Sequence, residues 1–217
     1  IEPDLLLPAQ PFSALDAFTR ASLQRDVRSI AKRLGFNLII APHDIDEAVK
    51  MADRIAIFKD GRLVQYDTPD NILAHPASSF VSDFVGGDRT LKRLQLLTVR
   101  DAMLSDPPRV KATDDLSQAA STMERHGHQA IVMVGPRGRA RGYVSLQAAR
   151  GASGMVGENH ETLPTTIRPH EDLRTAVSTM FRHDVSWLAC VDEDGMFVGY
   201  VTLRGMTRLL SETYRDG

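Results

Sequence analysis

Two short groups of polar residues near the start of the chain could take part in chemistry. His43 follows the apolar stretch 37–41, and Gln10 precedes a compact turn that contains Ser13 and Asp16. Gln10 can hydrogen-bond a water molecule but cannot accept a proton at neutral pH, which makes it a poor general base. A single histidine after a strand is more often structural than catalytic, and Ser13 and Asp16 could be simple turn residues.

A third polar group is basic. Arg137, Arg139 and Arg141 occupy one Gly-containing hairpin turn, and a matching turn at 192–194 is acidic throughout. An exposed basic turn could meet anionic lipid or phosphate, with an attraction of roughly 1 kcal/mol per basic residue at a membrane surface. It could also pair with the acidic turn of a second copy. A solvated loop is the simpler alternative.

Composition limits the class of protein. The chain has 217 residues, of which 42% are hydrophobic and 25% charged, as in ordinary globular proteins. The net charge of -2 gives no general electrostatic basis for nucleic-acid binding, so we expect none. No apolar run approaches the roughly 18–20 residues of a membrane-spanning helix and no secretory signal is visible, so we expect a cytoplasmic location.

Two further features concern single positions. Cys190 lies within an apolar run, which predicts a buried and unreactive thiol. The chain begins at Ile1 rather than at a methionine, and its opening reads like the middle of a domain. We therefore expect a fragment of a longer protein.

A repeat divides the second half of the chain. The stretch 115–149 aligns without gaps onto 172–206, and fourteen of the 35 paired positions are identical. The matches include Asp-Leu at both starts, Ser-Thr-Met near the middle and Gly-Tyr-Val near the end. The sequence therefore predicts two copies of one structural unit.

Each copy has the same expected order of elements, β-α-β-β-α. The expected strands are 109–111, 130–134 and 142–144 in the first copy, and 166–168, 188–191 and 197–201 in the second. A helix starts at each Asp-Leu pair, where an acidic residue suits the free amides and the helix dipole. A last helix is expected after Ser145 and after Thr202, each of which is a plausible N-cap.

Two such units in tandem resemble a pair of CBS domains, which pack into one module around a pseudo-twofold axis. The resemblance covers about residues 98–214 and implies a ligand cleft between the sheets. The candidate ligand residues are Arg109, Ser145, Arg168 and Thr202. Such domains usually bind ribose with Ser or Thr followed three residues later by Asp, a carboxylate that both copies lack. The two hydroxyls could therefore be helix caps alone.

The first 86 residues follow a different order. Strands are expected at 5–7 and 37–41, helices at about 20–34 and from 45, a hairpin around Asp60-Gly61, and a short helix opening at Thr68-Pro69. The ordered motifs Pro11-Phe12-Ser13-Ala14-Leu15-Asp16, His43-Asp44, Asp46-Glu47-Ala48, Ala52-Asp53-Arg54-Ile55 and Asp60-Gly61-Arg62 resemble the last third of an ABC-transporter nucleotide-binding domain.

This resemblance implies specific roles. It assigns His43 to the γ-phosphate and the attacking water, and it places Ser13 and Asp16 in the D-loop at the interface of two nucleotide-binding domains. ATP and Mg²⁺ are the cofactors of that family. Phosphoryl transfer needs positioned donors and a metal rather than covalent chemistry.

The chain also departs from the family pattern. The family has Asp-Glu before the D-loop segment, whereas this chain has Ala9-Gln10. Ala9 offers no ligand for Mg²⁺, and Gln10 is at best a degenerate catalytic residue. The phosphate-binding loop and the signature motif, which would precede Ile1, are absent as well. We therefore expect no ATP hydrolysis by this chain alone.

An ABC nucleotide-binding portion followed directly by two CBS domains is similar to the ATP-binding subunits of glycine betaine, carnitine, choline and proline importers. The predicted fold class is α/β and α+β, with the C-terminal part of an ABC nucleotide-binding domain followed by a tandem CBS pair. The predicted boundaries are 1–86 for the nucleotide-binding portion, 87–97 for a linker, 98–152 for the first CBS domain and 153–217 for the second.

The resemblance also implies partners and a mode of control. The expected partners are a second copy of the chain, a membrane permease subunit and anionic lipid, which would place the protein on the inner face of the cell membrane. Similar importers are controlled by cyclic di-AMP at the CBS dimer or by ionic strength, and an adenine nucleotide is a further possibility. The alternative function is a non-catalytic CBS module that binds a nucleotide such as cyclic di-AMP.

Overall fold

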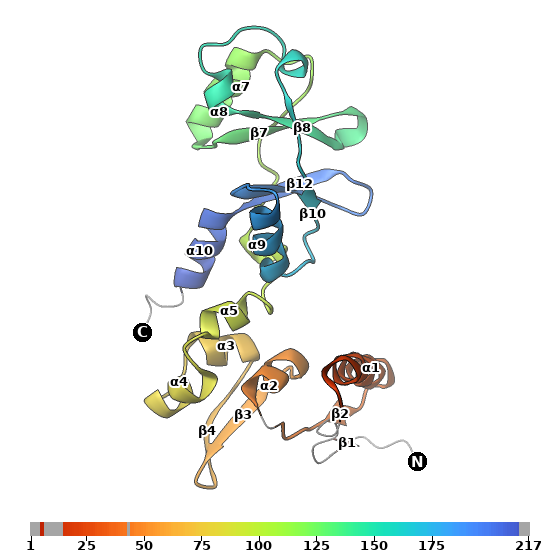
Figure 1. Cartoon of the computed structure of the whole chain (residues 1–217), viewed down its shortest axis with the longest axis vertical. Helices are drawn as coiled ribbons and strands as arrows, with labels where there is room; N and C mark the ends of the chain where they lie inside the picture. The colour runs from red at the N-terminus through yellow and green to blue at the C-terminus, as the bar shows by residue number, and fades with distance from the viewer. Residues whose placement is uncertain (1–4, 7–14, 43, 213–217) are drawn as a thin grey trace. The chain divides into compact units, whose positions relative to one another are not determined.

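The chain divides into two compact units, with the boundary between Leu96 and Leu97 (Figure 1). This architecture comes from a computed structural model that describes residues 5–6, 15–42 and 44–212. The two units are described separately below.

The first unit mixes helices with short strands. Its elements are β1 (Leu5–Leu6), α1 (Ala17–Leu34), β2 (Asn37–Leu38), α2 (Ile45–Met51), β3 (Ile55–Lys59), β4 (Arg62–Asp67), α3 (Pro69–Ala74), α4 (Ser79–Val85) and α5 (Arg89–Arg93). The strands β1 and β2 are parallel, and β3 and β4 form an antiparallel hairpin. Its core packs one face of α2 against the hairpin, α3 and α4, with Ile72, Leu73, Val81 and Val85 fully buried.

Local chemistry explains where these elements begin and end. Asp16 caps α1 and Asp44 caps α2, each through a carboxylate that accepts backbone N–H groups of the first turn. Gly35 ends α1 in the left-handed conformation, at φ 73°. The β3–β4 turn uses Asp60 and Gly61, both with positive φ, which suits a tight hairpin.

The second unit is built from the two repeats. Its elements are α6 (Val99–Ala102), β5 (Leu104–Ser105), β6 (Arg109–Val110), α7 (Leu116–His126), β7 (Ala130–Val134), η1 (Pro136–Gly138), β8 (Ala140–Ser145), α8 (Leu146–Ala149), η2 (Val156–Glu158), β9 (Glu161–Thr162), β10 (Thr166–Ile167), α9 (Leu173–Arg182), β11 (Trp187–Val191), β12 (Phe197–Thr202) and α10 (Leu203–Glu212). The β-α-β-β-α order predicted for each copy is therefore present.

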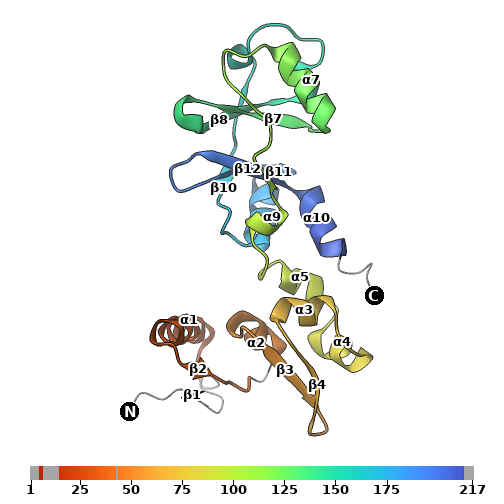
Figure 2. The ribbon, with the colours of Figure 1, turned by 180° about the vertical axis from the view of Figure 1, so that it is seen from behind.

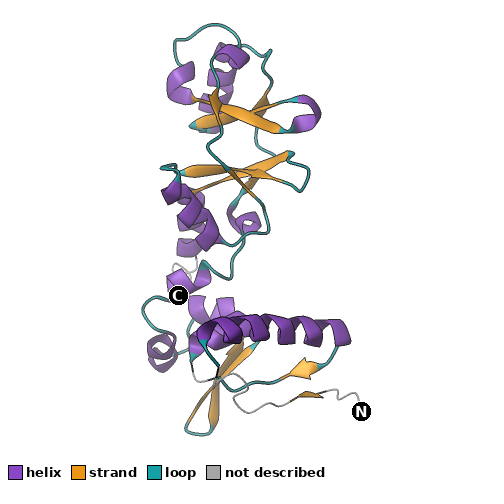
Figure 3. Cartoon of the chain, turned by 45° about the vertical axis from the view of Figure 1, so that its right-hand side comes forward, coloured by secondary structure: helices purple, strands orange, loops and turns teal. Residues whose placement is uncertain are grey.

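Two four-stranded sheets face each other in this unit, with the helices on their outer sides (Figures 2 and 3). Their strand orders are β6-β7-β8-β9 and β10-β11-β12-β5. The layer between the sheets contains Val132 and Val134 from the first repeat and Ala189 and Phe197 from the second. Cys190 is fully buried, and burial raises the pKa of its thiol to about 12.

The repeats exchange their outermost strands. The edge strand β5 precedes the first repeat but pairs with β12, with Ser105 opposite Gly199. The edge strand β9, which was assigned to the second domain, pairs with β8, with Thr162 opposite Gly142. Strand β5, at the start of the predicted first domain, thus completes the sheet of the second domain. Strand β9, in the predicted second domain, completes the sheet of the first.

Other elements also differ from expectation. The segment 87–97, expected to be a linker, contains α5, which packs against α3 within the first unit. The helix after Ser145 is a single turn, α8, whereas its counterpart α10 runs for ten residues. None of the helices in the described ranges is long and apolar enough to cross a membrane.

Candidate functional site

The predicted nucleotide-site residues are only partly visible. Gln10, Ser13 and His43 lie outside the described residues, as does Ala9. Asp16 is described, and its carboxylate accepts hydrogen bonds from the N–H groups of Phe18 and Thr19 at 3.1 Å each. The hydrogen bonds with Thr19 lower the pKa of Asp16, so it stays charged as the cap of α1.

The helices that follow the two motifs are tied to each other. Gln24 on α1 donates from Nε2 to Oε1 of Glu47 on α2 at 2.8 Å. Arg28 on α1 donates to the Lys50 carbonyl at 3.2 Å and to Asp53 at 3.0 Å. Helix α1, which starts after Asp16, and helix α2, which starts after Asp44, are thus joined by polar contacts.

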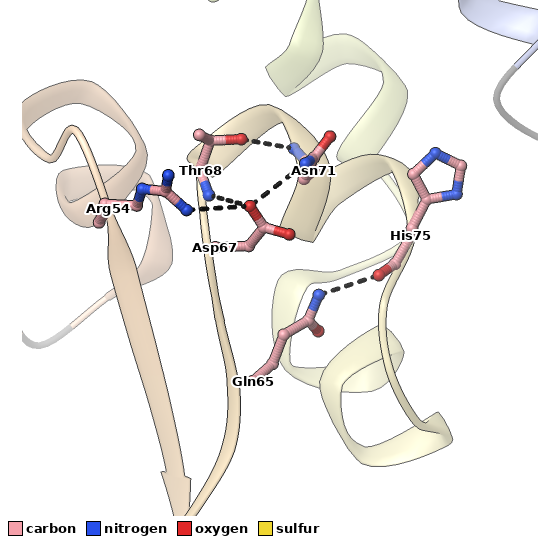
Figure 4. A network of polar contacts seen from close by, with 6 residues as sticks. All are labelled: Arg54, Gln65, Asp67, Thr68, Asn71 and His75. Atoms are coloured by element: carbon pink, nitrogen blue, oxygen red, sulfur yellow. Dashed lines mark hydrogen bonds and ion pairs between the residues drawn. The ribbon is translucent and has the colours of Figure 1, made fainter.

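A polar network fixes the start of α3 (Figure 4). Asp67 accepts from the Thr68 backbone N–H at 2.7 Å and from the Asn71 side chain at 3.2 Å, and Arg54 reaches it at 3.5 Å. These contacts, led by the bond from the Thr68 N–H, lower the pKa of Asp67. Thr68 caps the helix, as its Thr-Pro start predicts.

The two arginines named as CBS ligand residues are already paired. Arg109 forms an ion pair with Asp106, and its guanidinium lies 5.9 Å from the centre of the Phe197 ring. Arg168 forms an ion pair with Glu193 of the acidic turn. An incoming anion would have to compete with these carboxylates.

The two hydroxyl residues act as helix caps. Ser145 accepts a hydrogen bond from the Ala148 N–H at 3.2 Å, and Thr202 accepts one from the Gly205 N–H at 2.9 Å. The capping interpretation of these residues is therefore correct for this structure. Within the described part of the chain, no hydrogen bond or ion pair joins any two of Arg109, Ser145, Arg168 and Thr202.

Sequence reasoning missed an aromatic cluster between the sheets. The Trp187 ring lies edge-on to the rings of Tyr143 and Tyr200, at centroid distances of 5.3 Å and 6.3 Å. Tyr143 donates to Glu161 at 2.7 Å, and this bond raises its pKa to about 12. Tyr143 and Tyr200 are the tyrosines of the repeated Gly-Tyr-Val. The repeat could therefore have predicted that these two rings occupy equivalent positions in the two sheets.

The basic and acidic turns are adjacent within one chain. Arg139 and Met196 form a β-bridge, and the Ala140 N–H lies 3.4 Å from the Gly195 carbonyl. The two turns thus lie next to each other within one module, and pairing between copies stays a hypothesis. Arg137, Arg139 and Arg141 are all exposed there.

Positions 9 and 10, where the family pattern has Asp-Glu, supply no carboxylate ligand for Mg²⁺. Ala9 has no ligand atom, and Gln10 offers only a neutral amide oxygen. Among residues 5–6, 15–42 and 44–212, no group of three or more His, Cys, Asp or Glu side chains could hold a metal ion.

Comparison with known proteins agrees with the fold of the second unit. Residues 99–153 and 162–212 match the family model of the CBS domain. A similar solved structure is the CBS domain of a bacterial CNNM/CorC family Mg²⁺ transporter in complex with ATP, at 15% identity and a TM-score of 0.50, covering 56% of this chain and 92% of that one. The second unit is a tandem pair of CBS domains, which confirms the predicted fold class.

The curated relatives extend the match to nearly the whole chain. An osmoprotectant import ATP-binding protein of Salmonella typhimurium is 37% identical over 93% of this chain and 53% of its own length. A carnitine transport ATP-binding protein of Listeria monocytogenes is 33% identical over 98% of this chain and 54% of its own length. The chain spans about half the length of these relatives. Over nearly its whole length it is similar to the ATP-binding subunits of osmoprotectant ABC importers, which confirms the resemblance found in the sequence.

Proposed function

We propose that this chain is part of the ATP-binding, regulatory subunit of an ABC importer for quaternary-amine osmoprotectants of the glycine betaine, proline, choline or carnitine type. The observation that carries the proposal is the similarity across both units, at 37% identity over 93% of the chain. A relative that matched only the CBS pair would not support a transporter function.

The proposal implies particular partners and a location. A second copy would contribute to the nucleotide sites and to a CBS dimer, and a permease subunit would carry the solute. The protein would then act in the cytoplasm on the inner face of the membrane. ATP and Mg²⁺ would be held largely by residues other than those at positions 9 and 10, which lack the usual carboxylates.

A chimeric importer tests this function. The upstream half of the Salmonella relative is joined to this chain and expressed with that relative's permease and binding protein, in cells that have no other betaine importer. With Ala9→Asp and Gln10→Glu introduced, we expect glycine betaine uptake at high osmolarity, and without them we expect uptake at least about tenfold slower. A chimera that assembles with the permease but gives no uptake in either form would refute the proposal.

A second candidate function is a non-catalytic CBS module that binds a nucleotide such as cyclic di-AMP. The observation that favours it is Ala9-Gln10 at the positions of the metal-binding and catalytic carboxylates. Isothermal calorimetry of this chain with cyclic di-AMP, AMP and ATP tests it. Micromolar binding of cyclic di-AMP alone supports a second-messenger sensor, and the absence of heat with all three leaves ionic strength as the signal to test.

Ionic strength would act through the exposed basic turn. Each arginine of this turn would contribute roughly 1 kcal/mol to the attraction to an anionic surface at low salt, and high salt would screen this attraction. The three are Arg137, Arg139 and Arg141. Replacing all three by glutamate should abolish binding of this chain to vesicles rich in anionic lipid. Unchanged vesicle binding would exclude this turn as the salt sensor.

A further inference from the structure

Helix α5 is fastened to the first unit by two adjacent basic side chains. The Lys92 ammonium lies 2.9 Å from Asp88 Oδ1 and 3.1 Å from Asp46 Oδ1, and it donates to the Val85 carbonyl at 2.9 Å. These are three acceptors for its three N–H groups. Arg93 holds Asp70 with two hydrogen bonds, from Nε at 2.7 Å and from Nη2 at 3.2 Å.

Both anchors are removed from water. The side chain of Lys92 is 13% exposed and that of Arg93 is 3% exposed. Burial alone would lower the pKa of Lys92, but its hydrogen bonds to Asp88 and Asp46 outweigh this effect and keep the pKa above the usual value. The acidic partners of Lys92 are more exposed, at 54% for Asp46 and 58% for Asp88, so these ion pairs are partly buried and are screened by salt less than fully exposed pairs.

The two acceptors on other helices occupy equivalent places. Asp46 is the second residue of α2, and Asp70 is the second residue of α3. A carboxylate there also interacts favourably with the positive end of the helix dipole. Lys92 therefore joins α5 to the first turn of α2, while Arg93 joins α5 to the first turn of α3.

Helix α2 begins two residues after His43, with Asp44 as its N-cap. Helix α2 is also held by α1, through the Gln24–Glu47 hydrogen bond at 2.8 Å. Helix α5 ends three residues before Leu96, the last residue of the first unit before the CBS unit begins. The Lys92–Asp46 contact thus connects the last helix before the CBS unit to the helix that follows the histidine position.

We propose that Lys92 is a positioning residue that couples α5 to the first turn of α2, so that a change at the start of the CBS unit alters the placement of α2. This regulatory role rests on the proposed transporter function. The positioning of α2 by Lys92 does not, and it can be measured in this chain directly.

The acceptors of Lys92 provide a matched pair of variants. Asp46→Asn removes the negative charge that Lys92 meets on α2, whereas Asp88→Asn removes the negative charge at the start of α5 and leaves the ion pair with α2 in place. Hydrogen–deuterium exchange of the whole chain is followed over residues 45–51. We expect Asp46→Asn and Lys92→Gln each to speed α2 exchange by about threefold or more, and Asp88→Asn to leave it near the wild-type rate.

A double variant separates the bridge from the helix-dipole effect of Asp46. If the two side chains act through each other, Lys92→Gln combined with Asp46→Asn should exchange no faster than the more affected single variant. Additive effects, or equal effects of Asp46→Asn and Asp88→Asn, would overturn the positioning role.

The regulatory part is tested in the chimeric importer with Ala9→Asp and Gln10→Glu. ATP hydrolysis is measured in membranes of fixed lipid composition, from low to high KCl. We expect Lys92→Gln to keep most of the hydrolysis rate but to reduce its salt response at least about threefold, and Asp88→Asn to keep the response. A full salt response in Lys92→Gln would overturn the coupling. A chimera without hydrolysis would count against the proposed function, and the exchange data would still decide the positioning role.

Discussion

His128 lies where the two CBS repeats meet. Its Nδ1 is 2.7 Å from the Tyr200 hydroxyl of the second repeat, and the His126 ring stacks on it at 5.7 Å. Burial, and secondarily the charge of His126, lower the pKa of His128 below its ordinary value of 6.5. The folded protein therefore favours the neutral imidazole at this contact.

This shift predicts a pH dependence of stability. A depressed pKa means that the unfolded chain binds a proton more readily than the folded chain, so the free energy of unfolding should fall as pH drops below 6.5 through the folded pKa. Urea unfolding between about pH 7.5 and pH 5.5, followed by the fluorescence of the single tryptophan Trp187, measures it. His128→Asn should reduce the pH slope, and the exposed His183→Asn should retain it.

Burial makes the Cys190 thiol unreactive. Its side chain is fully buried, and the raised pKa keeps the thiol protonated at neutral pH. We predict that a thiol-specific reagent reacts with the native chain at least about a hundredfold more slowly than with the urea-unfolded chain, since only the thiolate attacks. Fast labelling of the native chain would show that the second unit opens around β11.

At the scale of elements, two matched glycines permit the strand exchange. A Cβ on Gly199 would lie 2.5 Å from the Leu104 carbonyl oxygen, and one on Gly142 would lie 2.6 Å from the Glu161 carbonyl oxygen. Both oxygens belong to the exchanged edge strands, β5 and β9. The repeated Gly-Tyr-Val thus has a physical cause, since only glycine lets the edge backbone approach this closely.

We predict that Gly199→Ala destabilises the second unit by about 1–3 kcal/mol, because β5 must move away from β12. Urea unfolding followed by Trp187 fluorescence gives the value. Gly87→Ala is a control, since a Cβ there meets nothing within 4 Å. A loss below about 0.5 kcal/mol for Gly199→Ala would show that β5 contributes little to the sheet.

At the scale of the molecule, the exchange makes the CBS pair one folding unit. A chain limited to 97–153 contains β5 without its partner β12, and a chain limited to 154–212 contains β9 without β8. Each half would also expose the apolar layer formed by Val132, Val134, Ala189 and Phe197. The halves should therefore be far less stable than the pair.

Circular dichroism during urea unfolding tests this expectation. We predict one cooperative transition for residues 97–212, and no cooperative transition for either half alone. A half that unfolded cooperatively at the midpoint of the pair would show that the repeats are independent domains.

The sequence by itself determined much of this protein. The 57-residue offset of the repeat predicted two units with the same order of elements, and the Asp-Leu and Thr-Pro starts predicted helix caps that the structure has. The ordered motifs and the repeat together predicted the similarity to importer ATP-binding subunits that the relatives show. These signals are local: a cap, a turn or a period of apolar residues acts over a few positions and leaves a pattern there.

Only the tertiary structure decided the rest. The strands β5 and β9 are two residues long, too short for an alternating pattern, and their partners lie in the other repeat. The segment 87–97 contains α5, whose Lys92 and Arg93 find acceptors at Asp46 and Asp70, far away in the chain. The pairing of these charged side chains depends on how the helices pack. The packing of segments that are distant in the chain produces no periodic pattern in the sequence.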